Sequence, residues 1–140
     1  MISIFFTSVT GRLALIFLGV DIILPYLLRR TRFSVFLGVA PRSGSTYLQR
    51  MWPHHGLGYL LVLFCTAHAW LSMQHGGMRQ ANIAGLWAAT LAFLLLVFQA
   101  ALGMLLRDPA LPTRKLLRSW HYWTMLALVV LIAGHVWLNG

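Results

Sequence analysis

Four histidines stand in two pairs of identical spacing. Fourteen residues separate His54 from His68, and fourteen separate His121 from His135. At about 100° per residue, a step of fourteen residues falls about 40° short of four full helical turns. Both histidines of a pair therefore lie on nearly the same helix face, about 21 Å apart along the helix axis. Two such helices side by side would place two facing pairs of imidazoles at two depths.

Facing imidazoles suit one chemistry in particular, because neutral imidazole is the common axial ligand of haem iron. Two imidazoles fill both axial positions, so such a group carries single electrons and has no open position for a substrate. The chain has one cysteine, Cys65, and no Cys-x-x-Cys-His attachment motif. The sequence therefore predicts two non-covalent haem b groups. Their expected ligands are His54 with His121 at the inner level and His68 with His135 at the outer level.

His55 is an alternative to His54 as the inner ligand. It lies thirteen residues before His68, which puts it about 140° away from the face of His68 and favours His54. A π-bulge or local underwinding near Pro53 would reverse that preference, so both residues stay candidates. His75 is expected in a loop rather than at a site.

Cationic side chains are candidates to bind haem propionates, which are anionic. Arg50 and Arg118 lie within about one helical turn of His54 and His121. Their alternative role is as ordinary charges that set membrane topology. Arg12 falls deep in the outer half of the first apolar segment, where it would either pair with a propionate or extend to the interface.

Other residues within the apolar segments have two interpretations each. Asp21 is the only acid within a segment; it would relay a proton or bond to a neighbouring helix, and the second role is favoured. Gln99 is similarly ambiguous. Small residues on the first and third segments would admit a flat macrocycle or serve plain helix packing. These small residues are Gly11, Gly19, Ala89 and Gly103.

The composition places these residues in a membrane. Of the 140 residues 59% are hydrophobic and 9% are charged, against roughly 25% charged residues in a typical soluble domain. Four apolar segments have about 20 residues or more, enough to cross a bilayer as helices. We expect an all-α integral membrane protein, a four-transmembrane-helix bundle forming one domain over residues 1–140. The expected spans are about 2–28, 54–73, 81–106 and 120–138.

The basic residues predict the orientation. The loops that follow the first and third spans contain nine of them, whereas the loop after the second span contains only Arg79. Positive loops stay in the cytoplasm, so we expect both basic loops there and both termini outside, in a prokaryotic inner membrane or its equivalent. Because the charge lies in loops between spans, the net charge of +9 does not indicate nucleic-acid binding. The nine residues are Arg29, Arg30, Arg32, Arg42, Arg50, Arg107, Arg114, Lys115 and Arg118.

The pattern resembles the haem-binding four-helix core of the cytochrome b family, in which the second and fourth helices each carry two histidines. It is also similar to ferric-reductase-like transmembrane domains. The resemblance rests on His54, His68, His121 and His135. It implies an electron-transfer subunit of a larger redox complex, with quinone as its small partner, rather than a stand-alone enzyme. The chain contains no glutamate, so it lacks the Pro-Glu-Trp-Tyr quinone-site motif of that family.

Three other functions stay open. One is a stand-alone b-type cytochrome that passes electrons between quinone and an external acceptor. The second is a haem-free membrane scaffold or assembly subunit whose histidines only pack. The third is a chlorophyll-binding protein whose histidines ligate magnesium.

Overall fold

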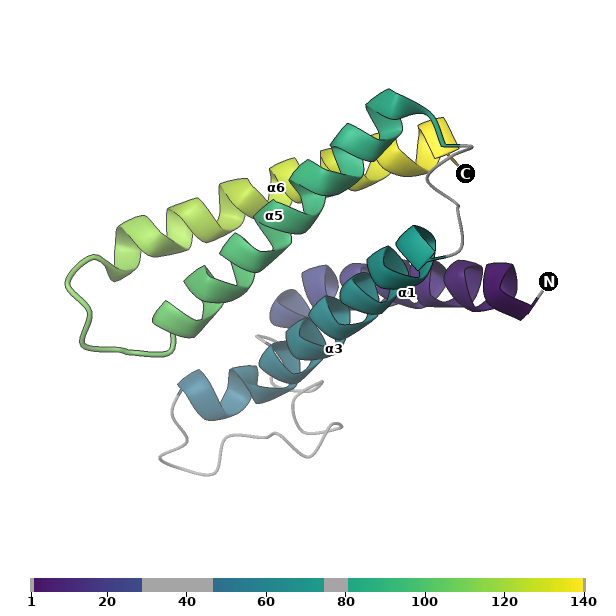
Figure 1. Cartoon of the computed structure of the whole chain (residues 1–140). Helices are drawn as coiled ribbons and strands as arrows, with labels where there is room; N and C mark the ends of the chain where they lie inside the picture. The colour runs from purple at the N-terminus through teal and green to yellow at the C-terminus, as the bar shows by residue number, and fades with distance from the viewer. Residues whose placement is uncertain (1, 29–46, 75–80, 140) are drawn as a thin grey trace.

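The computed structural model describes residues 2–28, 47–74 and 81–139. Within these ranges the chain forms four helices and no strand (Figure 1). All four are long and apolar enough to cross a membrane, so the predicted all-α four-helix fold is confirmed. The helices are α1 (Ile2–Leu28), α3 (Tyr47–Gln74), α5 (Ile83–Leu105) and α6 (Arg114–Asn139).

Two helices begin earlier than the apolar segments predict. α3 starts at Tyr47 rather than at about His54, and α6 starts at Arg114 rather than at about Trp120. The apolar pattern marks only the part of a helix that lies in hydrocarbon, whereas backbone hydrogen bonding continues into flanking polar turns. Pro53 lies inside α3 and, having no N–H, removes only one of the backbone hydrogen bonds of that helix.

The first turn of α5 is held by its capping residue. The side-chain oxygen of Asn82 accepts hydrogen bonds from the backbone N–H groups of Ala84 and Gly85, at 2.9 and 3.4 Å. Such a cap satisfies donors that have no partner within the helix. The backbone N–H of Asn82 donates to Oδ1 of Asn139 at 2.7 Å. This bond ties the start of α5 to the end of α6.

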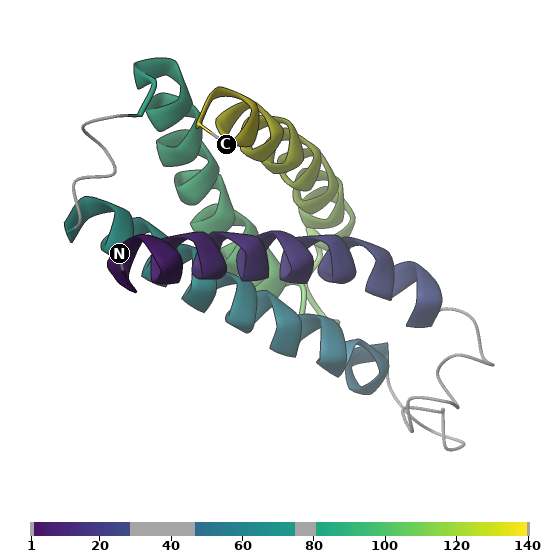
Figure 2. The same cartoon turned by 90° about the vertical axis from the view of Figure 1, so that its right-hand side faces the viewer.

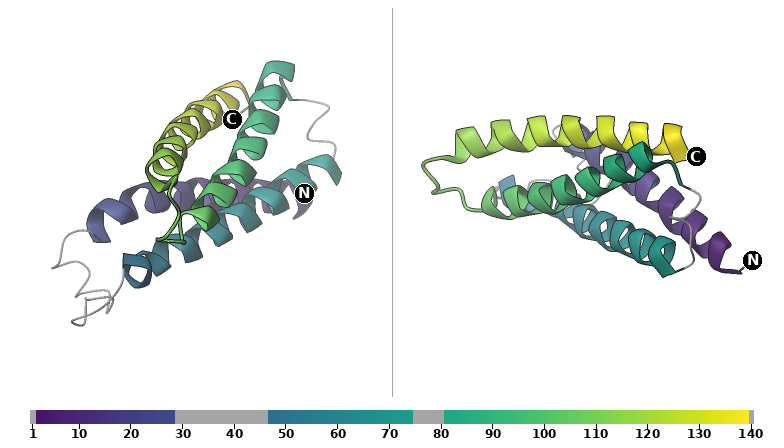
Figure 3. Two further views of the ribbon diagram at one scale, coloured as in Figure 1. Left: turned by 90° about the vertical axis from the view of Figure 1, so that its left-hand side faces the viewer. Right: turned by 45° about the horizontal axis from the view of Figure 1, so that its top comes forward.

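The helices form two hairpins. α1 packs closely along α3, α5 packs closely along α6, and a smaller contact joins α3 to α5. The two hairpins cross, as the views in Figures 2 and 3 show. α3 and α6, which carry the histidine pairs, run in the same direction, while α1 and α5 run in the opposite one. Both chain termini consequently lie at the same end of the molecule (Figure 1).

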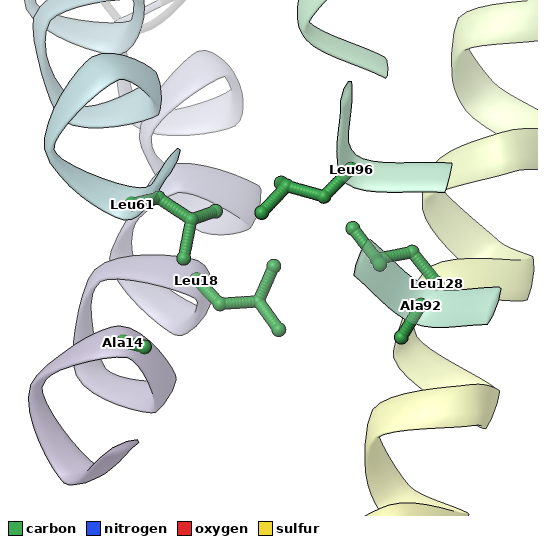
Figure 4. Packing of buried hydrophobic residues seen from close by; sticks show 6 residues of the cluster. All are labelled: Ala14, Leu18, Leu61, Ala92, Leu96 and Leu128. Carbon is green, nitrogen blue, oxygen red and sulfur yellow. The ribbon is translucent and has the colours of Figure 1, made fainter. Parts of the chain in front are cut away.

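One leucine from each helix points into the centre of the bundle (Figure 4). Leu18, Leu61, Leu96 and Leu128 are all buried, and Ala14 and Ala92 complete the cluster. We call these four leucines the leucine layer.

The leucine layer stands half-way between the two levels of histidine. Leu61 lies seven residues from both His54 and His68 on α3, and Leu128 lies seven residues from both histidines of α6. Seven residues are close to two helical turns, so these leucines share a face with the histidines. The layer therefore fills the centre of the bundle between the two pairs.

The outside of the bundle is apolar. Trp137, for example, is 88% exposed, and many leucines, isoleucines and phenylalanines are more than half exposed. Water would disfavour so large an apolar surface, whereas lipid chains suit it. Trp52 and Trp120 are exposed near the start of α3 and α6, and Trp70 and Trp137 near their ends. The surface is that of an integral membrane protein.

The leucine layer generates a stability prediction. We expect Leu61→Ala to lower the free energy of unfolding in detergent by about 2 kcal/mol or more, because it leaves a cavity where the side chain is 3% exposed. Leu63→Ala, at a position 61% exposed, should cost less than about 0.5 kcal/mol. Thermal unfolding followed by circular dichroism measures both variants, and equal losses would contradict the layer.

Candidate functional site: two interhelical histidine pairs

The structure brings the four histidines together in two pairs. The ring centroids of His54 and His121 are 6.4 Å apart, with the ring planes at 87°. Those of His68 and His135 are 6.5 Å apart, with the planes at 73°. Each pair joins α3 to α6, whose backbones contact each other far less than the two helices of either hairpin do. The imidazoles thus bridge a wide separation at two depths.

The centroid distances match those of two imidazoles on opposite sides of one metal ion. A ligating nitrogen lies roughly 2 Å from its metal and about 1.1 Å from its own ring centre, which puts two opposed centroids about 6.2 Å apart. The observed 6.4 and 6.5 Å agree with this value. The agreement holds at both levels of the bundle.

In the His68–His135 pair, each ring bonds to a backbone carbonyl. Nδ1 of His68 lies 2.9 Å from the carbonyl oxygen of Thr7 on α1, and Nδ1 of His135 lies 3.0 Å from that of Gly85 on α5. A carbonyl oxygen can only accept, so Nδ1 carries the proton and donates. Nε2 of each neutral ring is then unprotonated, which is the form that ligates a metal.

The His54–His121 pair has different neighbours. Oδ1 of Asp21 on α1 lies 2.8 Å from Nδ1 of His54, and the two side chains are 15% and 21% exposed. The distance is that of a hydrogen bond but the alignment is not, so we describe the contact as a close approach of the carboxyl group to the ring. Nδ1 of His121 is buried and has no hydrogen-bond partner among the described residues.

A polar contact from α5 also fixes the backbone of α6 at His121. Nε2 of Gln99 donates to the carbonyl oxygen of His121 at 3.0 Å. The hydroxyl of Thr124 in turn lies within hydrogen-bonding distance of two acceptors, Oε1 of Gln99 and the carbonyl oxygen of Trp120, and its single proton serves one of them at a time. Gln99 therefore acts on the position of His121 rather than on its ring.

Glycines lie beside one histidine of each pair. A Cβ atom added at Gly11 would come within 3.0 Å of Nδ1 and Cε1 of His68, and one at Gly103 would come within 3.7 Å of Cε1 of His121. A Cβ at Gly19 would meet nothing within 4 Å. Of the predicted small residues, Gly11 and Gly103 therefore border the histidine rings and Gly19 does not, while Ala89 is half-buried on α5.

His55 faces a different part of the structure. It lines a cavity of about 240 Å³ together with Trp52, Gly56, Tyr59 and Arg107. Its ring centroid is 5.8 Å from that of His54, but His54 is the residue that stands against His121. The helix is continuous through Pro53, and the choice of His54 over His55 as a ligand stays a prediction.

The predicted propionate partners lie at the edges of the bundle. Arg12 follows Gly11 on α1 and is exposed, and Arg118 is exposed one turn before His121 on α6. The side chain of Arg50, and His75 as a whole, fall outside the described residues. Pairing of these cations with a propionate stays a prediction.

Each histidine pair offers a metal only two protein ligands. Over residues 2–28, 47–74 and 81–139, no group of three or more His, Cys, Asp or Glu side chains is placed to hold a metal ion. A bare ion such as zinc takes about four ligands. The geometry therefore suits a metal that brings its own equatorial ligands, as the iron of a haem does.

Comparisons with family models, with curated proteins and with solved structures found no match for this chain. The resemblance to the cytochrome b family consequently rests on the histidine pattern alone.

The sequence singles out Asp21 and Gln99 but not Thr7 and Gly85, whose backbone carbonyls contact His68 and His135. Thr7 and Asp21 are fourteen residues apart on α1, and Gly85 and Gln99 are fourteen apart on α5. This is the spacing of the histidines themselves, and in antiparallel neighbours it places one contact at each level. The spacing marks no particular face of α1 or α5, so it identifies these four positions only once the neighbouring helices are known.

The contact of Gly85 with the end of α6 gives a stability prediction that needs no cofactor. A Cβ at Gly85 would come within 1.8 Å of Nδ2 of Asn139, so Gly85→Ala should displace that side chain and break its bond to Asn82. We expect a loss of about 0.5–1.5 kcal/mol.

Gly134→Ala is the matched control, because a Cβ there meets nothing within 4 Å. It should be neutral, or stabilising by up to about 1 kcal/mol through helix propensity. Thermal unfolding in detergent compares the two variants. A stable Gly85→Ala variant would argue against the close approach of α5 and α6.

Proposed function

We propose that this protein binds two haem b groups, one between His54 and His121 and one between His68 and His135, and carries single electrons within the membrane. The observation that carries the proposal is the pair of centroid distances, 6.4 and 6.5 Å. An iron held by two imidazoles exchanges one electron at a time and has no open coordination position. The protein supplies the ligands, their orientation and a medium that excludes water.

Three other features support this proposal. The Nδ1 bonds of His68 and His135 leave Nε2 available. Gly11 and Gly103 keep side chains away from two of the rings. The wide spacing of α3 and α6 is bridged at the histidines.

The paired arrangement favours haem over the other candidate functions. Histidines that only pack have no reason to meet at the same distance twice. A magnesium ion in chlorophyll needs one axial imidazole, whereas each pair here presents two rings to one position. The colour of the purified protein separates the three cases, since low-spin haem b, chlorophyll and a protein without pigment have distinct spectra.

We further propose the orientation and the partners. The basic loops after α1 and α5 would face the cytoplasm, with both termini outside. The His54–His121 pair would then be the inner one and the His68–His135 pair the outer one. By resemblance to the cytochrome b family, the protein would serve a larger redox complex and exchange electrons with quinone.

The haem content tests the proposal directly. We expect two haem b per chain by pyridine haemochrome assay, and a dithionite-reduced minus oxidised spectrum of low-spin type. His68→Ala should remove one haem and leave the other, because the two pairs share no ligand. A protein purified without haem from a haem-replete membrane, or a His68→Ala variant that keeps both haems, would overturn the proposal.

A second prediction concerns the choice between the adjacent histidines. His54→Ala should lose one haem, because its ring faces His121. His55→Ala should retain two, because its ring lines the neighbouring cavity. The same haemochrome assay measures both variants, and the reverse result would assign His55 as the ligand.

A further inference from the structure

The two histidine pairs differ in the charge of the groups that contact their Nδ1 atoms. His68 and His135 contact neutral backbone carbonyl oxygens, at 2.9 and 3.0 Å. His54 contacts a carboxylate oxygen of Asp21 at 2.8 Å. Asp21 is one of only two acids in the chain. The other, Asp108, is exposed between α5 and α6.

A carboxylate on Nδ1 changes what Nε2 does to a metal. Its negative charge, 2.8 Å from Nδ1 of His54, raises the basicity of the ring electrostatically, so Nε2 becomes a stronger electron donor. A stronger donor stabilises ferric over ferrous iron and so lowers the midpoint potential. The fixed negative charge acts in the same direction, and half-burial of Asp21 and His54 limits its screening.

Three described cations near the histidine pairs are exposed. Arg107, on the rim of the cavity that His55 lines, and Arg118, one turn before His121, lie near the His54–His121 pair, and Arg12 follows Gly11, which borders the ring of His68. Exposure screens all three charges more strongly than the charge of Asp21. The carboxyl group of Asp21 is therefore the main electrostatic difference between the two pairs.

We propose that Asp21 sets a potential difference between the two sites, with the His54–His121 site lower and the His68–His135 site higher. This inference rests on the proposed function. Asp21 acts through His54 and is a positioning residue rather than a ligand. With haem bound at both sites, one electron would move downhill from ferrous iron at the first site to ferric iron at the second, and no bond would form or break.

An anaerobic redox titration of the purified holoprotein, at fixed pH and followed in the haem absorption band, tests the proposal. Wild type should titrate in two components. Asp21→Asn replaces the carboxylate with a neutral amide oxygen, like the carbonyls at the other site. It should raise the midpoint potential of the lower component by at least about 59 mV. For a one-electron couple, this is a tenfold change in the ratio of reduced to oxidised haem at a given potential. Asp108→Asn is the control and should leave both components in place.

A second measurement assigns each component of the titration to one of the two sites. It can be made even if the Asp21→Asn variant loses a haem. In His68→Ala the haem that remains is the one at His54–His121, and it should titrate at the lower wild-type potential. Titration at the higher potential, or an Asp21→Asn shift no larger than that of Asp108→Asn, would overturn the inference while leaving two bound haems intact. A wild-type protein without haem would instead overturn the proposed function, and the inference with it.

Discussion

Backbone N–H and C=O groups cannot remain unpaired in hydrocarbon, and the geometry of the candidate site depends on that constraint. It keeps each apolar segment in one continuous helix, so that a step of fourteen residues becomes a fixed rotation and a fixed rise. Two parallel helices with the same step then present their histidines at the same two depths. No loop has to place a ligand, and the bundle has only to hold α3 and α6 at the right separation.

That separation follows from how large and small side chains alternate along the helices. The leucine layer is bulky and fills the centre, where one side chain from each helix meets the others. Seven residues to either side, α3 and α6 carry imidazole, while the facing positions of α1 and α5 include small residues such as Gly11 and Gly103. A close-packed centre resists compression, and the small residues leave room beside the rings. The same seven-residue step therefore serves both the core and the site.

The sequence predicts the helices and the histidine pairing because both follow from periodicity within a single segment. It does not predict that α3 begins at Tyr47 or α6 at Arg114, since polar turns can continue a helix beyond the apolar pattern. The sequence also does not predict the contact of Asp21 with His54, because the rotation of α1 against α3 depends on packing between helices. α1 and α5 carry no histidine to mark which face turns inward. Their own fourteen-residue steps, Thr7 to Asp21 and Gly85 to Gln99, gain meaning only once the neighbours are known.

The polar contacts show that the four helices have different roles. Isolated hydroxyls bond to carbonyls of their own helix, as Thr66 does to Val62 and Thr90 to Leu86, which satisfies them locally in lipid. The contacts between helices instead gather at the histidine levels. α1 contacts His54 and His68 of α3, through the carboxylate of Asp21 and the carbonyl of Thr7.

α5 does the same for α6, through the carbonyl of Gly85 and the amide of Gln99. Each hairpin is thus one helix that carries a pair of histidines and one helix that contacts them at both levels. Because α1 alone brings a charge to this task, the two levels of the bundle are alike in shape and unlike in electrostatics. In the proposed function, this asymmetry would make one of the two sites the preferred position of an electron.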